Sequence, residues 1–529
     1  METTEPGNPH GRLRIAAILL ALALSLFIAA LDTTIVATAI PTIASDLHSA
    51  TGYSWIGGAY LLANAAGAPI WAKISDIWGR KPILLIAVAI FGGGSLMCAL
   101  SNSMEMLIAA RALQGVASGG LMQLVNIVIS DIFSMRLRSL FFGLLECIWG
   151  VAGGVGPVLG GTFAQFVSWR WIFWINLPFS GLAFILLLLF LDVHNPKTRL
   201  YDGIRAIDWF GSLSIIGLTV MLLLGLNFGG STFPWDSPKV ICLIIFGCLM
   251  SIVFIYNERW LAKYPLMPLR IVRERSNVMC ILIVAAHGFV HVGVEFYLPL
   301  YFQSVKEASP VRSGALILPF ILSQTVTGIA AGVLIHRTGR YVEIMWIGSF
   351  ILTFGIGMLV HLNATSPLGQ IIGFQIIGGL GSGVLFGPPL IALQAHVSQD
   401  DTATATATGS FLRNLGSSMS VVLGGVVFQN GMHLQAAHMR NAGIPTDVVQ
   451  HLSEGDGGAS VQVISAMVDN AQKLAVKQAF AWSLRNLWIL YTCMAFVGFV
   501  ATVFVGKRTL SKEHVETKTG LKVEMLQPN

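Results

Sequence analysis

Long apolar stretches, separated by short polar segments, run along almost the whole chain. An α-helix needs about 20 mostly apolar residues to cross the hydrocarbon core of a bilayer, and fourteen stretches are of that order. They are residues 14–37, 53–72, 82–101, 104–127, 139–163, 171–191, 207–228, 239–257, 276–300, 312–335, 341–361, 367–392, 403–429 and 485–505. Alternating strand patterns are absent, so the pattern predicts an all-α integral membrane protein with 14 transmembrane helices.

The composition supports this prediction. The chain has 529 residues, of which 54% are hydrophobic and 11% are charged. Soluble domains carry about 25% charged residues, so this chain cannot cover a water-facing surface. All 6 cysteines fall in predicted helices, which indicates neither a disulfide framework nor a metal site, and we expect no cofactor.

The net charge of +6 reflects topology rather than binding of nucleic acid. If the N-terminus is placed in the cytosol and the loops alternate, 22 of the 32 lysines and arginines lie on the inner side and eight on the outer side. Cytosolic loops of membrane proteins carry such an excess of cations. We therefore expect both termini in the cytosol, and a plasma-membrane protein, with the vacuolar membrane as the alternative.

Three short matches indicate an internal repeat. Gly79-Arg80 matches Gly339-Arg340 at an offset of 260, while 114–119 matches 378–383 and 158–161 matches 422–425 at an offset of 264. Chance resemblance between glycine-rich helices could explain one match but not three in register. The repeat predicts two pseudo-symmetric six-helix bundles with two inserted helices, an architecture typical of secondary transporters.

We divide the chain into seven parts on this basis. They are a cytosolic tail (1–13), an N-terminal bundle (14–191), two inserted helices with their loops (192–275), five helices of the second bundle (276–430), a large outer loop with an amphipathic helix (431–484), a last helix (485–505) and a cytosolic tail (506–529).

Several motifs resemble those of the major facilitator superfamily, specifically its fourteen-helix drug:proton antiporter branch as found in fungi. They are Leu31–Pro41 (LDTTIVATAIP), 72–82 (AKISDIWGRKP), Arg111–Gly115 (RALQG), Gly150–Gly161 (GVAGGVGPVLGG) and Trp169–Pro178 (WRWIFWINLP). Ala72 stands where the loop motif usually begins with glycine. The resemblance covers about residues 12–508, and the Gly150–Gly161 motif is typical of antiporters.

The resemblance implies roles for two groups of residues. One is a conformational latch at Asp76, Gly79, Arg80 and Lys81, in which Asp76 pairs with Arg80 or with a cation across the interface. The other is an antiporter hinge at Gly150, Gly154, Gly156, Pro157, Gly160 and Gly161. Positive-inside anchoring and generic helix packing are the simpler alternatives. His336 aligns with Asp76, which weakens any second latch.

Ionisable residues inside the apolar stretches are candidates for proton coupling or for the substrate cavity, because a charge in the membrane interior costs about 2.5–3.5 kcal/mol or more. They are Asp32, Arg111, Glu146, His287, His291, Glu295 and Arg413. His287, His291 and Glu295 share one helix face. Arg111 could instead pair with a carboxylate, Glu295 could be solvated at the outer interface, and the triad lacks a fourth ligand for zinc.

These observations predict a proton-coupled efflux transporter of a small, largely apolar organic compound such as a drug, fungicide, toxin or secondary metabolite. The alternatives are a transporter of a cationic solute such as a basic amino acid, or a non-transporting membrane sensor. No phosphate-binding loop and no enzymatic constellation is recognisable, so we expect neither ATP hydrolysis nor an enzyme. We expect a monomer whose partners are protons, a small molecule and lipid, with Asn363 as a candidate glycosylation site.

Overall fold

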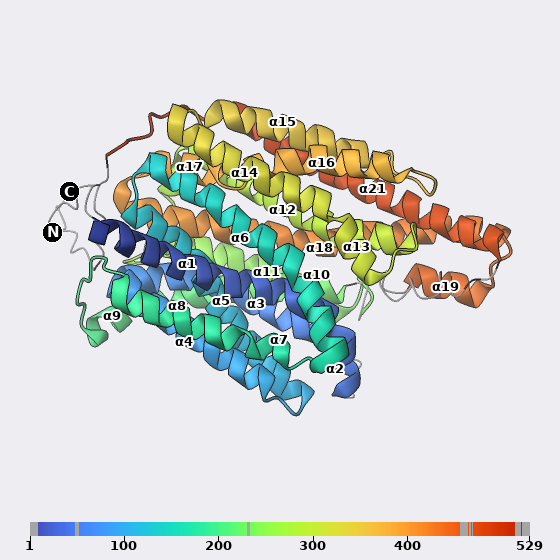
Figure 1. The fold of residues 1–529 in the computed structure, drawn as a ribbon, viewed down its shortest axis with the longest axis horizontal. Helices are drawn as coiled ribbons and strands as arrows, with labels where there is room; N and C mark the ends of the chain where they lie inside the picture. The colour runs from blue at the N-terminus through green and yellow to red at the C-terminus, as the bar shows by residue number, and fades with distance from the viewer. Residues whose placement is uncertain are drawn as a thin grey trace.

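The computed structural model is an elongated bundle of long helices lying side by side (Figure 1). It describes residues 9–47, 52–229, 233–454, 464, 467, 469–513 and 520. Among these residues the only β pairing is an isolated bridge between Gly229 and Phe233. Apart from this bridge, the regular secondary structure of the described residues is therefore helical, as the sequence predicts.

Thirteen helices of the described chain are long and apolar enough to cross a membrane. A further helix, α3, has 27 residues, which brings the number of long helices to the predicted fourteen. Short apolar pieces complete several of the spans: α7 precedes α8, α13 precedes α14, and α17 follows α16. The break between α16 and α17 comes before Pro388 and Pro389, because proline cannot donate the backbone hydrogen bond that would continue the helix.

The first half of the bundle and the inserted pair have the following elements. They are α1 (Pro9–Ile35), α2 (Ile40–Asp46), α3 (Gly52–Trp78), α4 (Arg80–Ala99), α5 (Met104–Ile132), α6 (Met135–Thr162), α7 (Trp171–Trp174), α8 (Asn176–Phe190), α9 (Leu200–Ala206), α10 (Trp209–Phe228) and α11 (Pro238–Tyr256).

The second half follows a linker that contains no long helix. Its elements are α12 (Arg275–Ser304), α13 (Pro310–Leu316), α14 (Leu318–Thr338), α15 (Val342–Leu359), α16 (Leu368–Val384), α17 (Pro388–Ala395), α18 (Thr402–Asn441), α19 (Thr446–Glu454) and α21 (Asn470–Val503).

The two ends of the bundle differ, and we name them for reference. Helix α1 begins and α21 ends at the same end, which we call the proximal end; α2 and α19 lie at the opposite, distal end (Figure 1). At the proximal end, Gly79 separates α3 from α4 with φ +95°, and Gly339 separates α14 from α15 with φ +72°. Both glycines adopt a backbone conformation that other residues rarely tolerate, at equivalent places in the two halves.

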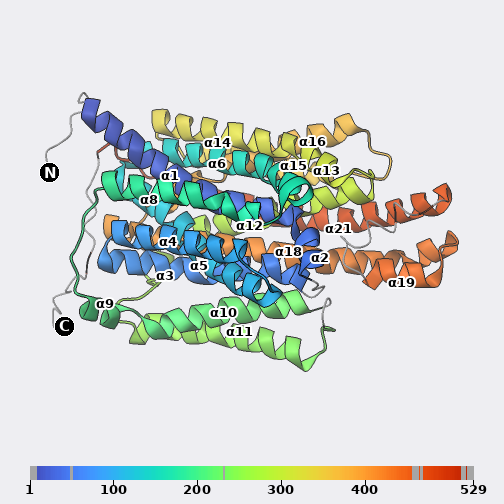
Figure 2. The ribbon, with the colours of Figure 1, turned by 60° about the horizontal axis from the view of Figure 1, so that its bottom comes forward.

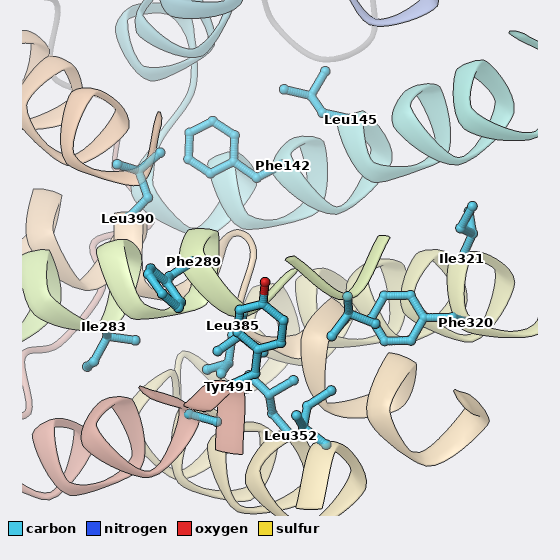
Figure 3. Close-up of a cluster of buried hydrophobic side chains, with 14 of the residues drawn as sticks. Phe142, Leu145, Ile283, Phe289, Phe320, Ile321, Leu352, Leu385, Leu390 and Tyr491 are labelled. Atoms are coloured by element: carbon cyan, nitrogen blue, oxygen red, sulfur yellow. The ribbon is translucent and has the colours of Figure 1, made fainter. Parts of the chain in front are cut away.

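One apolar core joins the two halves. Figure 3 shows part of it, with Phe142 and Leu145 on α6 of the first half, and Phe320 and Ile321 on α14 of the second. Tyr491 on α21 belongs to the same cluster. Helices α6 and α14 therefore form a main contact between the halves.

The inserted helices α10 and α11 pack on each other and lie as a layer along one side of the bundle (Figure 2). Helix α10 contacts both α3 of the first half and α18 of the second. A small hydrophobic cluster unites Ile215 and Phe254 of the insert with Leu266 of the linker and Phe411 of α18. The insert thus contacts both halves.

The distal segment differs from its expected boundaries. Helix α18 continues past residue 430 to Asn441, and α21 begins at Asn470, so the expected amphipathic stretch and the expected last helix form one helix from there on. Asp469 caps this helix by accepting a hydrogen bond from the backbone N–H of Ala471 at 2.9 Å. No proline interrupts residues 470–503, so the helix has no reason to break at 484. Most of 455–468 lies outside the described residues.

Candidate functional site

A buried ion pair lies in the distal half of the first bundle. Asp32, near the end of α1, pairs with Arg111, in the third turn of α5; their side chains are 0% and 2% exposed. Arg111 also donates from Nε to the backbone carbonyl of Ile56 at 3.1 Å and from Nη1 to Gln114 at 2.8 Å. The arginine therefore has a counter-charge and further hydrogen-bond acceptors, as a buried charge requires.

Asp32 receives further hydrogen bonds from two amides. Gln114 donates from Nε2 to Asp32 Oδ1 at 2.9 Å, and Asn176 of α8 donates to the same oxygen at 3.1 Å. The guanidinium of Arg111 lies 4.2 Å from the ring centre of Tyr60. Gln114, Asn176 and Tyr60 are not among the predicted site residues, although Gln114 and Asn176 fall inside the quoted motifs. Their polar side chains, inside motifs that lie in apolar stretches, are the sequence feature that could have predicted them as site residues.

A second ionisable cluster lies near the middle of the second bundle. His287 Nε2 is 3.0 Å from the carbonyl oxygen of Ser382, and the His287 ring stacks on the His291 ring with centres 5.6 Å apart. His291 Nε2 lies 3.6 Å from Glu295, whose side chain is 34% exposed. The predicted shared face of α12 is therefore present, with exposure increasing from His287 towards Glu295.

Arg413 of α18 joins this cluster through Phe386. It donates from Nη2 to the Phe386 carbonyl oxygen at 2.6 Å, and its guanidinium lies 4.5 Å from the Phe386 ring centre. Arg413 forms no ion pair within 4.0 Å among the described residues. Across the described chain, no group of three or more histidine, cysteine or acidic side chains is arranged to hold a metal ion.

A further ionisable residue, Glu146 of α6, lies within electrostatic range of Arg413 and Glu295 of the second cluster. It is 1% exposed on α6, and among the described residues neither of its carboxyl oxygens has a hydrogen-bond partner. Gln324 of α14 faces it without a hydrogen bond of good geometry between them. Its side chain lies against Gly328 of α14, at the contact between the halves.

The expected latch residues lie at the proximal end. Arg80 pairs with Asp76 at 2.5 Å and with Asp131 of α5 at 2.7 Å, and it is 1% exposed. Of the two partners considered for Asp76, the structure therefore contains Arg80, within the same half. Lys81 takes no part in this network and instead donates to the carbonyl of Leu188 at 2.8 Å. Asp131 is not among the predicted site residues, because it lies beyond the expected helix end at residue 127.

Hydrogen bonds between the halves close the bundle at the proximal end. Gln394 of α17 donates to Ser130 of α5 and to Thr406 of α18, both at 2.9 Å, and accepts from Arg138 of α6 at 3.2 Å. His336, which aligns with Asp76 in the repeat, lies 3.1 Å from the carbonyl of Arg136 instead. The two halves therefore use different polar contacts at equivalent positions.

The expected hinge residues divide into two groups. Gly150 packs against Thr325 of α14, and Gly156 and Gly160 pack against α1; an added methyl group would collide at all three positions. Added methyl groups at Gly154 and Gly161 would meet no atom closer than 3.6 Å. Pro157 lies inside α6, which ends in one wide turn over Phe163–Val167. The glycines thus allow α6 to approach both halves closely.

Asn363 is exposed at the distal end, in the loop between α15 and α16. Its side-chain oxygen accepts hydrogen bonds from the backbone N–H and the hydroxyl of Thr365, both at 2.9 Å. The geometry leaves the asparagine accessible, and its glycosylation stays a prediction.

The comparisons of the sequence with known proteins agree with one another on one family of transporters. A sequence model described as Major Facilitator Superfamily matches residues 22–421. The chain is 44% identical over 510 residues to efflux pump dotC of Dothistroma septosporum, covering 96% of this chain and 87% of that protein. It is 36% identical over 528 residues to efflux pump FUS6 of Gibberella moniliformis, covering 98% and 92%.

A solved structure resembles the fold. The human organic anion transporter MFSD10 (TETRAN) superposes with a TM-score of 0.53 at 15% sequence identity, over 92% of this chain and 100% of that one. This similarity supports the arrangement of the helices alone.

Proposed function

The chain belongs to the Major Facilitator Superfamily, and from this premise we propose that it exports a small, largely apolar organic compound in exchange for protons. The observation that carries the export proposal is the 34–44% identity, along nearly the whole chain, to fungal proteins named as efflux pumps. Members of this family move solutes across membranes, so the chain is a multi-pass transporter and not an enzyme.

The orientation is proposed from the distribution of charges. The helix ends that carry the cations expected on the inner side lie at the proximal end, so we place that end in the cytosol and both termini with it. The hydrogen bonds from Gln394 and Arg138 then close the cytosolic side. Alternating access would require these contacts to break when the compound is loaded.

Proton coupling is proposed from the ionisable groups inside the bundle. Protonation of Asp32 would remove the counter-charge of Arg111 and shift the balance between conformations. Further candidates within the long helices are Glu146, His287, His291, Glu295 and Arg413. At about 100 mV and one pH unit, each entering proton supplies roughly 3.7 kcal/mol, enough for an approximately 500-fold gradient of a neutral compound.

The alternative of a cationic solute finds less support. Asp32 already pairs with Arg111 and accepts from two amides, so little of its charge is free to attract a cation.

The test is efflux from cells that express the protein, using fluorescent apolar compounds with and without a protonophore. We expect efflux that stops when the protonophore is added, and no such efflux in cells with empty vector. Efflux that continues unchanged would contradict proton coupling. Uptake or export of a basic amino acid without transport of any apolar compound would favour the alternative.

A further inference from the structure

A small cavity lies at the contact between α6, α14 and α17, on the proximal side of Glu146. Its free space for the centre of a water molecule is about 10 Å³, which is room for about one water molecule. Its lining residues include Ser139, Gly143 and Glu146 of α6 and Gly328 and Gly332 of α14. From Glu146 to Ser139 the cavity follows about two turns of α6 towards the proximal end.

The walls of the cavity are held closed by tight helix packing. A methyl group added at Gly143 would lie 2.9 Å from the carbonyl oxygen of Gly328. At the proximal side, Ser139 donates a hydrogen bond to the carbonyl of Gly332 at 3.1 Å. Because α6 belongs to the first half and α14 to the second, this cavity can open only when the halves separate there.

Glu146 is the one titratable residue that lines the cavity. The charged groups that act on it from other helices are Arg413 of α18 and Glu295 of α12, while α14 and α17 contribute no titratable lining residue. Asp32 of α1, on another side of α6, is engaged with Arg111 and lies farther towards the distal end. Neither carboxyl oxygen of Glu146 has a described hydrogen-bond partner.

A charged Glu146 would be a buried carboxylate without an ion pair among the described residues, which is costly inside a membrane protein. A neutral carboxylic acid avoids that cost. Opening of the α6–α14 contact would admit water to hydrate the charged form. The protonation of Glu146 and the closure of this contact are therefore linked.

We propose that this cavity is a proton-exchange site, in which protonated Glu146 accompanies the closed α6–α14 contact and gives its proton to water at the proximal side when the contact opens. In that step the O–H bond of the Glu146 carboxyl group breaks. A water molecule takes the proton and becomes hydronium, and Glu146 becomes a carboxylate. The inference deepens the proposed antiport by assigning one site of proton release.

The test measures opening directly and needs neither substrate nor gradient. Two cysteine variants are made in a protein whose native cysteines are replaced. The thiol of Ser139→Cys is accessible only when the α6–α14 contact is open, whereas the thiol of Leu200→Cys, on the exposed helix α9, is always accessible and serves as the reference. Both are labelled with a maleimide in inside-out vesicles between about pH 6 and pH 8. Dividing the Ser139→Cys rate by the Leu200→Cys rate removes the intrinsic pH dependence of a thiol.

We expect this labelling ratio to increase by up to about tenfold for each unit rise in pH in the range where Glu146 titrates. The reason is that the ratio of deprotonated to protonated Glu146 rises tenfold per pH unit. Glu146→Gln, which cannot ionise, should keep the ratio low and flat, whereas the same change at exposed Glu105 should leave the pH dependence intact. A Glu146→Gln protein with the unchanged pH dependence, or a wild-type ratio without any, would overturn the proposal.

Gly143→Ala gives a second measurement if Glu146→Gln fails to fold. Its methyl group should prevent closure and make Ser139→Cys accessible at every pH, so a low labelling ratio would contradict the assigned contact. The protonophore test of export is separate: export without proton coupling would remove the antiport proposal, while the labelling would still decide whether Glu146 controls the contact.

Discussion

Asp32 and Glu146 are two buried carboxyl groups with opposite surroundings. Asp32 faces an arginine and two amides, so its charge is compensated within the bundle. Glu146 borders a small cavity, has no ion pair among the described residues and lies beside the amide of Gln324 on α14. The sequence marked both as costly residues in apolar stretches, but it could not distinguish them, because their partners come from α5, α8 and α14, far away along the chain.

The first residue-scale prediction concerns Asp32→Asn. The variant leaves Arg111 buried without its counter-charge, and removal of one member of a buried pair costs about 3–5 kcal/mol. We expect a lower unfolding temperature in detergent and loss of export. Asp32→Glu keeps the charge and should recover part of both; a stable Asp32→Asn protein with full export would exclude a role for the pair.

At the scale of elements, the apolar stretches predicted the long helices, whereas their ends depended on contacts that sequence does not contain. Helix α18 extends to Asn441, since Met432 and Met439 are buried beyond the expected end. The network at Arg80 was predicted in part: Asp76 was expected, but Asp131 reaches Arg80 only because α3, α4 and α5 pack together at the proximal end.

Asp76→Asn tests the latch at this scale. Asp76 is 27% exposed, and Arg80 keeps its pair with Asp131, so the fold should survive the substitution. We expect near-normal expression with reduced export, measured as initial efflux rate per amount of protein in the membrane. Full export, or failure to fold, would contradict the latch.

At the distal end, a pH-dependent group of ion pairs connects the α12–α13 loop with α21. Glu307, between α12 and α13, pairs with Lys473 at 2.7 Å and with Lys477, both on α21. Hydrogen bonds from these lysines hold the pKa of Glu307 below its ordinary value. A carboxyl with a lowered pKa adds stability that is fully present above its unfolded pKa, about 4.3, and is lost as the pH falls through the folded value.

We therefore predict that the start of α21 becomes less protected as the pH falls below about 4.3, by a small amount because the pair is partly exposed. Hydrogen exchange of residues 470–480, corrected for the intrinsic pH dependence of exchange, measures this. Glu307→Gln should remove the acid-dependent component. An identical acid response in that variant would show that another group controls it.

At the scale of the whole molecule, the internal repeat predicted two bundles and an inserted pair, and the family membership supports that architecture. The sequence does not predict where the insert packs, because α10 and α11 are apolar around most of their surface and no single face marks the contact. The contacts of Leu266 and Phe411 decide it, and they depend on the folded arrangement of α18.

The position of α10 also makes the two sides of the bundle, at which the boundary between the halves reaches the lipid, different from each other. Beside α3 and α18, an additional layer of helices covers the boundary between the halves. Beside α6 and α14, exposed Val155, Leu322 and Val326 present bare aliphatic surface. A compound dissolved among the acyl chains therefore meets a shielded flank on one side and an unshielded one on the other, so lateral diffusion would deliver it to the boundary from a single direction.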